Sequence, residues 1–281
     1  MSPIESIWRV WLDEIIEDRV GPVHRMSTRS GATLLITDAL VIKVHRAGTD
    51  LAALADRMAA VRATPDLWVP PAHHELRIAP DGRPATLWPK VAVVDPSGTV
   101  PWAEAGALLA ALHRQPVTGL RLPTHDRSVR LRRARQRLVG SPYEITLGQV
   151  GDRLLTELAA APTRSPVLVH GDWHLGQLGQ MGQVDPVWRL LDLDDLALGD
   201  PEWDLARPAG WWAAGLLPDE DWNEFRLSYR QSSGAVWADG WSALDLPARW
   251  AVYLAACRAG NASGDSLPPE VATCLDICLK W

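Results

Sequence analysis

The chain changes character near Val94, and this change limits the folds open to it. Before Val94, apolar residues come in short runs separated by turn residues, which is typical of β-strands. After Val94, apolar residues recur at helical spacing, and helices are predicted at residues 102–114, 127–138, 147–160, 219–230 and 246–258. We therefore expect an α+β, two-lobed architecture, with a small β-rich lobe over residues 1–94 and a larger helical lobe over residues 95–281.

Length and composition bound the class of protein. The chain has 281 residues, of which 47% are hydrophobic and 22% charged, which suits two globular cores. A net charge of −6 argues against nucleic acid as the main partner and mildly favours a cationic ligand. No run could span a bilayer, no signal peptide is evident and three cysteines suit a reducing compartment, so we expect a cytoplasmic monomer or homodimer without a membrane partner.

One segment of fewer than forty residues concentrates carboxylates, imidazoles and an amide. Apolar runs at 166–169 and 187–191 read as short buried strands, so Asp172 and Asp192 each come just past a strand end. Loops at strand ends commonly carry chemistry. The density of polar groups points to a phosphoryl-transfer site.

Phosphoryl transfer needs a carboxylate that accepts a hydroxyl proton and oxygen ligands that hold Mg²⁺ against nucleotide phosphates. Asp172, which follows a glycine, is the candidate base. Gln177 offers an amide oxygen and Asp192 a carboxylate, and both suit a hard cation. We predict that Asp172 performs chemistry while Gln177 and Asp192 coordinate the metal.

The sequence H-G-D-W-H-L-G-Q at 170–177, the hydrophobic-Asp pair at 191–192 and G-D-P-E-W-D-L-A at 199–206 resemble the signature of aminoglycoside phosphotransferase-like kinases. This resemblance implies a protein-kinase-like fold, ATP or GTP and Mg²⁺ as cofactors, Asp172 as the base, Gln177 and Asp192 as metal ligands and Asp200 as a brace for the loops. The family usually has Asn where this chain has Gln177. A similar motif ending in Gln occurs in bacterial amino-sugar and maltose kinases.

Simpler interpretations exist for the neighbours of these residues. Asp200 and Asp204 could cap and brace a helix that starts near Pro201. His170 closes an apolar strand and is better explained as a buried, hydrogen-bonded histidine. Asp194 either joins a second Mg²⁺ or stays in the outer shell of the site. Trp173 and His174, beside the proposed base, are the candidates for acceptor contact.

The N-terminal part offers a nucleotide-covering hairpin and a lysine. Residues 23–28 and 32–37 read as strands around the turn 29–31, where Gly31 could bring backbone N–H groups close to phosphates, although an ordinary hairpin is the default. Lys43 lies within the apolar strand 39–44. Burying its ammonium is costly unless an anion meets it, so we predict a phosphate contact; the alternative is an edge-strand lysine that faces water.

In kinases similar to this chain, a glutamate on the following helix holds that lysine. The helix predicted at 50–63 has no glutamate, so we expect Asp56 to pair with Lys43, and Asp50 is better explained as the N-cap. Further strands at 72–79 and 84–93 flank the turn 80–82. The resemblance implies that Lys90, Val91 and Ala92 form a hinge that binds adenine through backbone groups.

Three function classes remain. The first is an ATP-dependent O-phosphotransferase that inactivates a cationic antibiotic, either an aminoglycoside or a viomycin/capreomycin-type peptide, or that acts on an amino sugar or sugar. The second is a metal-dependent phosphoesterase, and the third is a catalytically silent nucleotide-binding relative. Acidic residues could line a pocket for an amine-rich acceptor, whereas the arginines on the helix at 127–138 are better explained as a solvated face. The acidic candidates are Asp219, Glu220, Asp221, Glu224 and Asp239.

Overall fold

Short strands in the first third of the chain form a five-stranded antiparallel sheet. The computed structural model describes residues 3–16, 21–28, 30–95, 97–162, 166–182, 186–233, 240–261 and 267–281. The turn at Asp81 and Gly82, where Gly82 has a positive φ, joins the last two strands as the turn chemistry predicts. In sheet order the strands are β1 (His24–Ser27), β2 (Thr33–Ile36), β3 (Leu40–Val44), β5 (Pro84–Pro89) and β4 (Arg77–Ile78).

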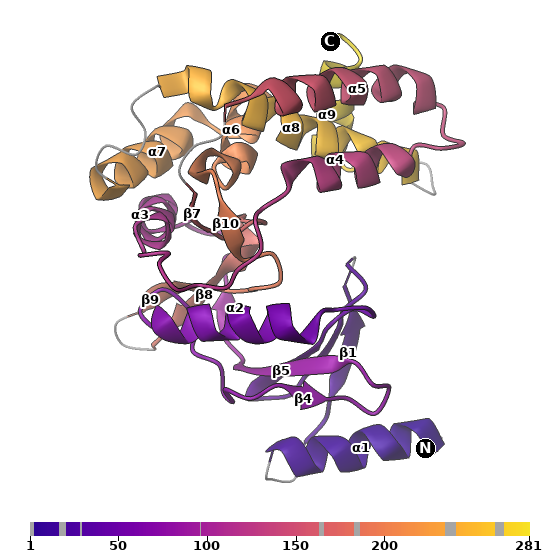
Figure 1. Ribbon diagram of the computed structural model, residues 1–281, viewed down its shortest axis with the longest axis vertical. Coiled ribbons are helices and arrows are strands. Elements are labelled where there is room, and N and C mark those ends of the chain that lie inside the picture. The colour runs from indigo at the N-terminus through magenta and orange to yellow at the C-terminus, as the bar shows by residue number, and fades with distance from the viewer. Residues whose placement is uncertain are drawn as a thin grey trace. The chain divides into compact units, whose positions relative to one another are not determined.

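The two faces of this sheet carry different helices. Ile42 and Val44 of β3 are fully buried on the face that packs against Leu12 and Ile15 of α1 (Pro3–Ile16). Because side chains alternate along a strand, Lys43 belongs to the other face. Figure 1 shows α1 and α2 (Leu51–Ala63) on opposite sides of the sheet. Asp50 caps α2 by accepting from the backbone N–H groups of residues 52 and 53, as the sequence predicts.

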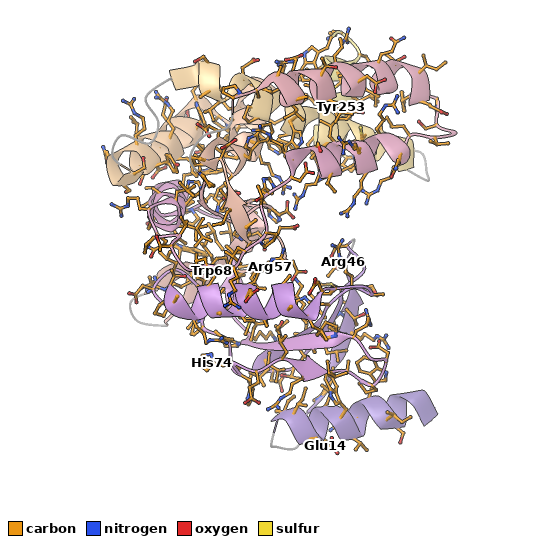
Figure 2. All side chains as sticks on the ribbon, viewed as in Figure 1. Glu14, Arg46, Arg57, Trp68, His74 and Tyr253 are labelled. Carbon is orange, nitrogen blue, oxygen red and sulfur yellow. The ribbon has the colours of Figure 1, made fainter. Side chains whose placement is uncertain are left out.

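A second sheet brings a late segment of the chain to the N-terminal unit. Its strands are β6 (Ala92–Val93), β8 (Leu178–Met181) and β9 (Val187–Leu190). The backbone of Leu190 also bonds to Leu67 and Val69 beside Trp68, which is labelled in Figure 2 near α2. Unit 1 therefore comprises Met1–Val94, Leu120–Leu122 and Leu178–Asp194, and unit 2 the remaining segments. This division differs from the predicted boundary, because Asp192 lies in unit 1 rather than in the helical part.

Unit 2 is mainly helical, and its predicted helices begin within three residues of the observed ones. Tyr253 is fully buried where two of them meet, because Gly151 leaves room for its ring (Figure 2). A short sheet pairs β7 (Val167–Val169) with β10 (Ala197–Gly199). The helices are α3 (Trp102–His113), α4 (Arg127–Gln136), α5 (Glu144–Ala160), α6 (Ala206–Ala213), α7 (Asp219–Ser233), α8 (Asp245–Ala256) and α9 (Pro269–Cys278).

Some expectations concern residues outside these ranges. Arg29 of the predicted turn and the acidic candidate Asp239 lie outside the described residues. Within the described part of the chain, the helices are too short or too polar to cross a bilayer.

Candidate active site

The loop that carries Asp172 is built on a glycine. Gly171 follows β7 with φ of 81°, a backbone conformation that side chains disfavour. A β-carbon at this position would also collide with the backbone carbonyl of Asp195. The tight turn therefore requires glycine and fixes the position of the next residue, Asp172.

Asp204 holds the same loop through its backbone. Its two carboxylate oxygens accept hydrogen bonds from the backbone N–H groups of His170, at 2.6 Å, and Gly171, at 2.8 Å. The Nε2 atom of His113 lies 3.1 Å from the carboxylate, and Nδ1 of His113 lies 2.7 Å from the Tyr229 hydroxyl. Burial would raise the pKa of Asp204, but these partners hold it below its usual value. Asp204 is therefore a brace for the Asp172 loop.

The structure modifies the roles predicted for this region. Asp200 precedes the 3₁₀ turn Pro201–Trp203 but makes no side-chain capping bond there. It pairs instead with Arg127 at 2.9 Å. The capping explanation offered for Asp200 and Asp204 is therefore wrong, because their oxygens are used by a guanidinium and by a neighbouring loop. His170 is buried, with 1% of its surface exposed, in agreement with the prediction of a buried histidine.

Asp172 is held by two arginines. Its Oδ1 atom accepts from Nη1 of Arg130 at 2.6 Å and from Nη2 of Arg207 at 3.1 Å. Arg130 also donates to Asp195 at 2.6 Å, so one guanidinium spans two carboxylates. Burial raises the pKa of Asp172, but the charges of Arg130 and Arg207 outweigh burial and keep the pKa below its ordinary value. Asp172 is thus strongly maintained as a carboxylate.

These contacts change the interpretation of the arginine-rich helix α4. Arg127 and Arg130 engage Asp200 and Asp172, and Arg135 pairs with Asp152 at 2.8 Å. The solvated-face interpretation fails for Arg127 and Arg130, whose side chains are 16% and 23% exposed. Periodicity could not separate these two arginines from their neighbours, because their partners lie far away in the sequence.

Gln177 closes the 3₁₀ turn Leu175–Gln177, and only 9% of its surface is exposed. Its backbone N–H donates to the carbonyl of His174 at 2.8 Å. His174 in turn accepts the N–H of Gly176 at its Nδ1 atom, at 3.1 Å. The turn is thus fixed by local bonds, and its amide side chain offers the kind of oxygen that suits Mg²⁺.

Unit 1 brings Lys43 together with the end of β9. The Nζ atom of Lys43 lies 2.6 Å from Oδ1 of Asp192 and 2.9 Å from Oδ2 of Asp194. Burial would lower the pKa of Lys43, but the two carboxylates raise it above its ordinary value, so the ammonium is retained. The water-facing alternative for Lys43 is excluded, because its side chain is only 12% exposed.

Asp192 has an unusual backbone. Its φ is 60°, and among the described residues it is the one non-glycine residue with a positive φ. Aspartate tolerates this conformation better than most residues. Its Oδ1 atom also accepts the backbone N–H of Asp194 at 3.1 Å, which closes a tight local turn. The turn directs two carboxylates toward the same lysine.

The helix carboxylate expected beside Lys43 is not used. In the part of the chain that the structure describes, Asp192 and Asp194 are the carboxylates paired with Lys43, and Asp56 on α2 is not among them. The prediction for Asp56 was wrong because Lys43 pairs with two carboxylates that are distant from it in the sequence.

The predicted hinge and hairpin lie in unit 1. The N–H of Lys90 donates to the carbonyl of Ala39 at 2.7 Å, so this group is already used within the unit. Val91 follows, and Ala92 lies opposite Gln180 in the second sheet. Gly31 adopts φ of 88° at the β1–β2 turn, where its N–H bonds to the carbonyl of Thr28. Glycine is therefore needed at this turn.

A pocket of about 400 Å³ opens in unit 2 next to the Asp172 loop. Its lining includes Arg207, which also contacts Asp172, together with His174 and Asp221 of α7. Three indoles complete the polar and aromatic part of the lining, namely Trp102, Trp173 and Trp211. Trp173 itself is 3% exposed and stacks on Phe225, with ring centroids 5.2 Å apart. Trp173 is therefore a buried side chain that forms part of the pocket wall.

A small antiparallel-sheet unit and a larger helical unit with these motifs define a protein-kinase-like fold. The model of the phosphotransferase enzyme family matches residues 27–246, and the chain belongs to this family. The protein is accordingly a small-molecule kinase. No curated protein sequence matches it.

Solved structures share the fold at low sequence identity. A choline/ethanolamine kinase family protein from Mesorhizobium loti is 15% identical with a TM-score of 0.66, covering 99% of this chain and 94% of that one. The GDP complex of the aminoglycoside 2′-phosphotransferase-IIIa F108L mutant is 15% identical with a TM-score of 0.65, covering 99% and 95%. The amicoumacin kinase hAmiN in complex with AMP-PNP, Ca²⁺ and Ami is 13% identical with a TM-score of 0.67, covering 99% and 94%.

Proposed function

We propose that this kinase transfers the γ-phosphate of ATP or GTP to a hydroxyl group of a small, amine-bearing molecule. The observation that carries the proposal is the pairing of Lys43 with Asp192, at 2.6 Å, across 149 positions of the chain. A buried lysine beside a carboxylate suited to a metal is what phosphate and Mg²⁺ binding need. GDP and AMP-PNP in the solved relatives are consistent with a nucleotide.

Each group has a distinct role in this proposal. Asp172 orients the acceptor hydroxyl and accepts its proton, and it remains ionised because two arginines favour the carboxylate. Lys43 neutralises charge on the nucleotide phosphates. Gln177 and Asp192 supply hard oxygen ligands for Mg²⁺, which when bound shields the phosphate charge. The hinge residues Lys90–Ala92 and Gly31 contribute backbone contacts to the nucleotide through groups other than the N–H groups of Lys90 and Gly31, which already bond to Ala39 and Thr28.

The acceptor we propose is a cationic antibiotic of the aminoglycoside or viomycin/capreomycin type, which the transfer would inactivate. Asp221 in the pocket supports an amine, and the partly exposed indole of Trp211 supports a ring that stacks on it. An amino sugar is the second candidate. It is favoured by the charge of the pocket, since Asp221 is the one carboxylate among the described lining residues and Arg207 balances it.

The test is a coupled ADP-release assay over aminoglycosides, viomycin- and capreomycin-type peptides, amino sugars and neutral sugars. Turnover that depends on both nucleotide and acceptor would support the proposal and name the acceptor class. Nucleotide binding without turnover of any acceptor would support the silent relative instead. Release of phosphate from phosphoesters without ATP would support the phosphoesterase, which family membership already disfavours.

A further inference from the structure

Lys43 has two carboxylate partners, Asp192 and Asp194, and these two residues have different roles. The proposed function, on which this inference rests, assigns the oxygens of Asp192 to Mg²⁺. A carboxylate that coordinates a dication shares its charge with the metal and holds an ammonium less strongly. Asp194, 2.9 Å from Lys43, is then the partner that remains available to the lysine.

Asp194 is itself held from the other side. Its Oδ2 atom meets Lys43, and its Oδ1 atom lies 2.9 Å from Nδ1 of His45. Burial would raise the pKa of Asp194, but His45 and Lys43 lower it, so the group is kept as a carboxylate. One oxygen faces each partner, so the carboxylate lies between Lys43 and His45.

His45 provides a rigid support. Lys43 and His45 are two positions apart at the end of β3, so the alternation of an extended chain places them on the same face of the sheet. The backbone N–H of His45 donates to the carbonyl of Pro84 at 2.8 Å, and the residue is only 1% exposed. Its backbone is therefore held by the sheet, and its side chain is enclosed.

The support extends into β5. The Nε2 atom of His45 lies 3.0 Å from the hydroxyl of Thr86, which is fully buried and accepts Nε1–H of Trp88 at 2.9 Å. The Thr86 hydroxyl can donate to Nε2 of His45 while it accepts from Trp88, and Nδ1 of His45 then faces Asp194. The lysine is thus connected to the interior of the sheet through Asp194, His45 and Thr86.

The helix that follows β3 offers no equivalent. The α2 sequence contains no glutamate, Asp50 is used as its N-cap, and Asp56 is not among the described partners of Lys43. We infer that Asp194, supported by His45, is the positioning residue that holds Lys43 for the nucleotide phosphates, in the place of a helix glutamate.

A double-mutant cycle on ATP affinity tests this inference. Equilibrium binding of Mg²⁺-ATP, without acceptor, is measured for the wild type, Lys43→Met, Asp194→Asn and the double variant. We expect Asp194→Asn to weaken binding roughly tenfold, with little further loss when Lys43 is already replaced, because partners in one charge pair are not additive. Asp194→Glu should restore part of the affinity. Losses that simply add would overturn the inference.

Matched variants separate positioning from folding and from the proposed function. Asp13→Asn removes a carboxylate from an exposed ion pair on α1 and should leave ATP affinity unchanged. His45→Asn, whose amide can take the place of the ring nitrogen that faces Asp194, should retain more affinity than His45→Ala at equal thermal stability. A loss in Asp56→Asn that equals the loss in Asp194→Asn would transfer the role to α2 and overturn the inference. A wild type that binds no ATP would overturn the proposed function as well.

Discussion

Nη1 of Arg130 lies 2.6 Å from Oδ1 of Asp172, so the candidate base carries a permanent positive neighbour. Because Arg130 lowers the pKa of Asp172, its removal should raise that pKa toward the ordinary value. Activity should fall at acidic pH as Asp172 becomes protonated. In Arg130→Gln this fall should therefore begin at a higher pH than in the wild type. The measurement is kcat/KM as a function of pH.

Arg132→Gln is the matched control for this prediction. Arg132 lies on the same helix, α4, but its side chain is exposed, and in the described part of the chain the ion-pair partners of Asp172 are Arg130 and Arg207. A fall in activity that begins at the wild-type pH in Arg130→Gln, or that moves equally in both variants, would show that Asp172 does not set it.

Asp172→Asn should remove proton acceptance while preserving the shape of the side chain. We expect kcat to fall by about 10²–10⁴-fold, the usual contribution of a positioned acid–base group. Affinity for the nucleotide should change little, because the residue is assigned to the acceptor hydroxyl. ADP release measures the loss of turnover, and equilibrium ATP binding measures the nucleotide affinity. Near-normal turnover would show that Asp172 is not the base.

Gln177→Asn should keep activity, because the shorter side chain still presents an amide oxygen. The half-saturating concentration of Mg²⁺ should rise, since the ligand is one methylene shorter. Gln177→Leu has a similar size but no oxygen, and it should lose most activity at all Mg²⁺ concentrations. A titration of turnover against Mg²⁺ compares the three proteins, and equal curves for Leu and Gln would exclude a metal ligand here.

Asp204→Asn should destabilise the protein. The buried carboxylate accepts two backbone N–H groups and faces His113, and breaking one partner of such a site costs roughly 3 kcal/mol. Since the pKa of Asp204 is lowered in the folded state, its contribution is present above the unfolded pKa and is lost as pH falls through the folded value. Urea unfolding at neutral and acidic pH measures this.

The control for that prediction is Asp152→Asn. Asp152 pairs with Arg135 at the surface, and exposed pairs contribute about 0–1 kcal/mol. The difference between the two variants in the free energy of unfolding should become smaller at acidic pH. A loss in Asp204→Asn no larger than that in Asp152→Asn would contradict the bracing role.

Local patterns were sufficient for much of the fold. Apolar spacing predicted β3 and the start of α3 at Trp102, and turn chemistry predicted the β4–β5 hairpin. The strand predicted at 72–79 is reduced to Arg77–Ile78. Helix α1 was missed, although Trp8, Leu12 and Ile15 have helical spacing that could have shown it.

The candidate site was less accessible to sequence reasoning. Strand ends and residue types were enough to select Asp172 and Asp192, since their local context is visible in the chain. The pairings of these groups were not, because tertiary packing brings Arg130 and Arg207 to Asp172 and Lys43 to Asp192. Asp204 was missed as an anchor for a related reason, since it binds backbone N–H groups that no sequence pattern marks.

Unit 1 includes Leu178–Asp194, which the ribosome makes long after the first sheet. During synthesis, β6 can pair with β8 only after the whole stretch from Asp95 to Gln177 has emerged. The same holds for Lys43 and its two carboxylate partners. A nascent chain that stops before Leu178 would therefore leave the edge of β6 unpaired and Lys43 without its two carboxylate partners.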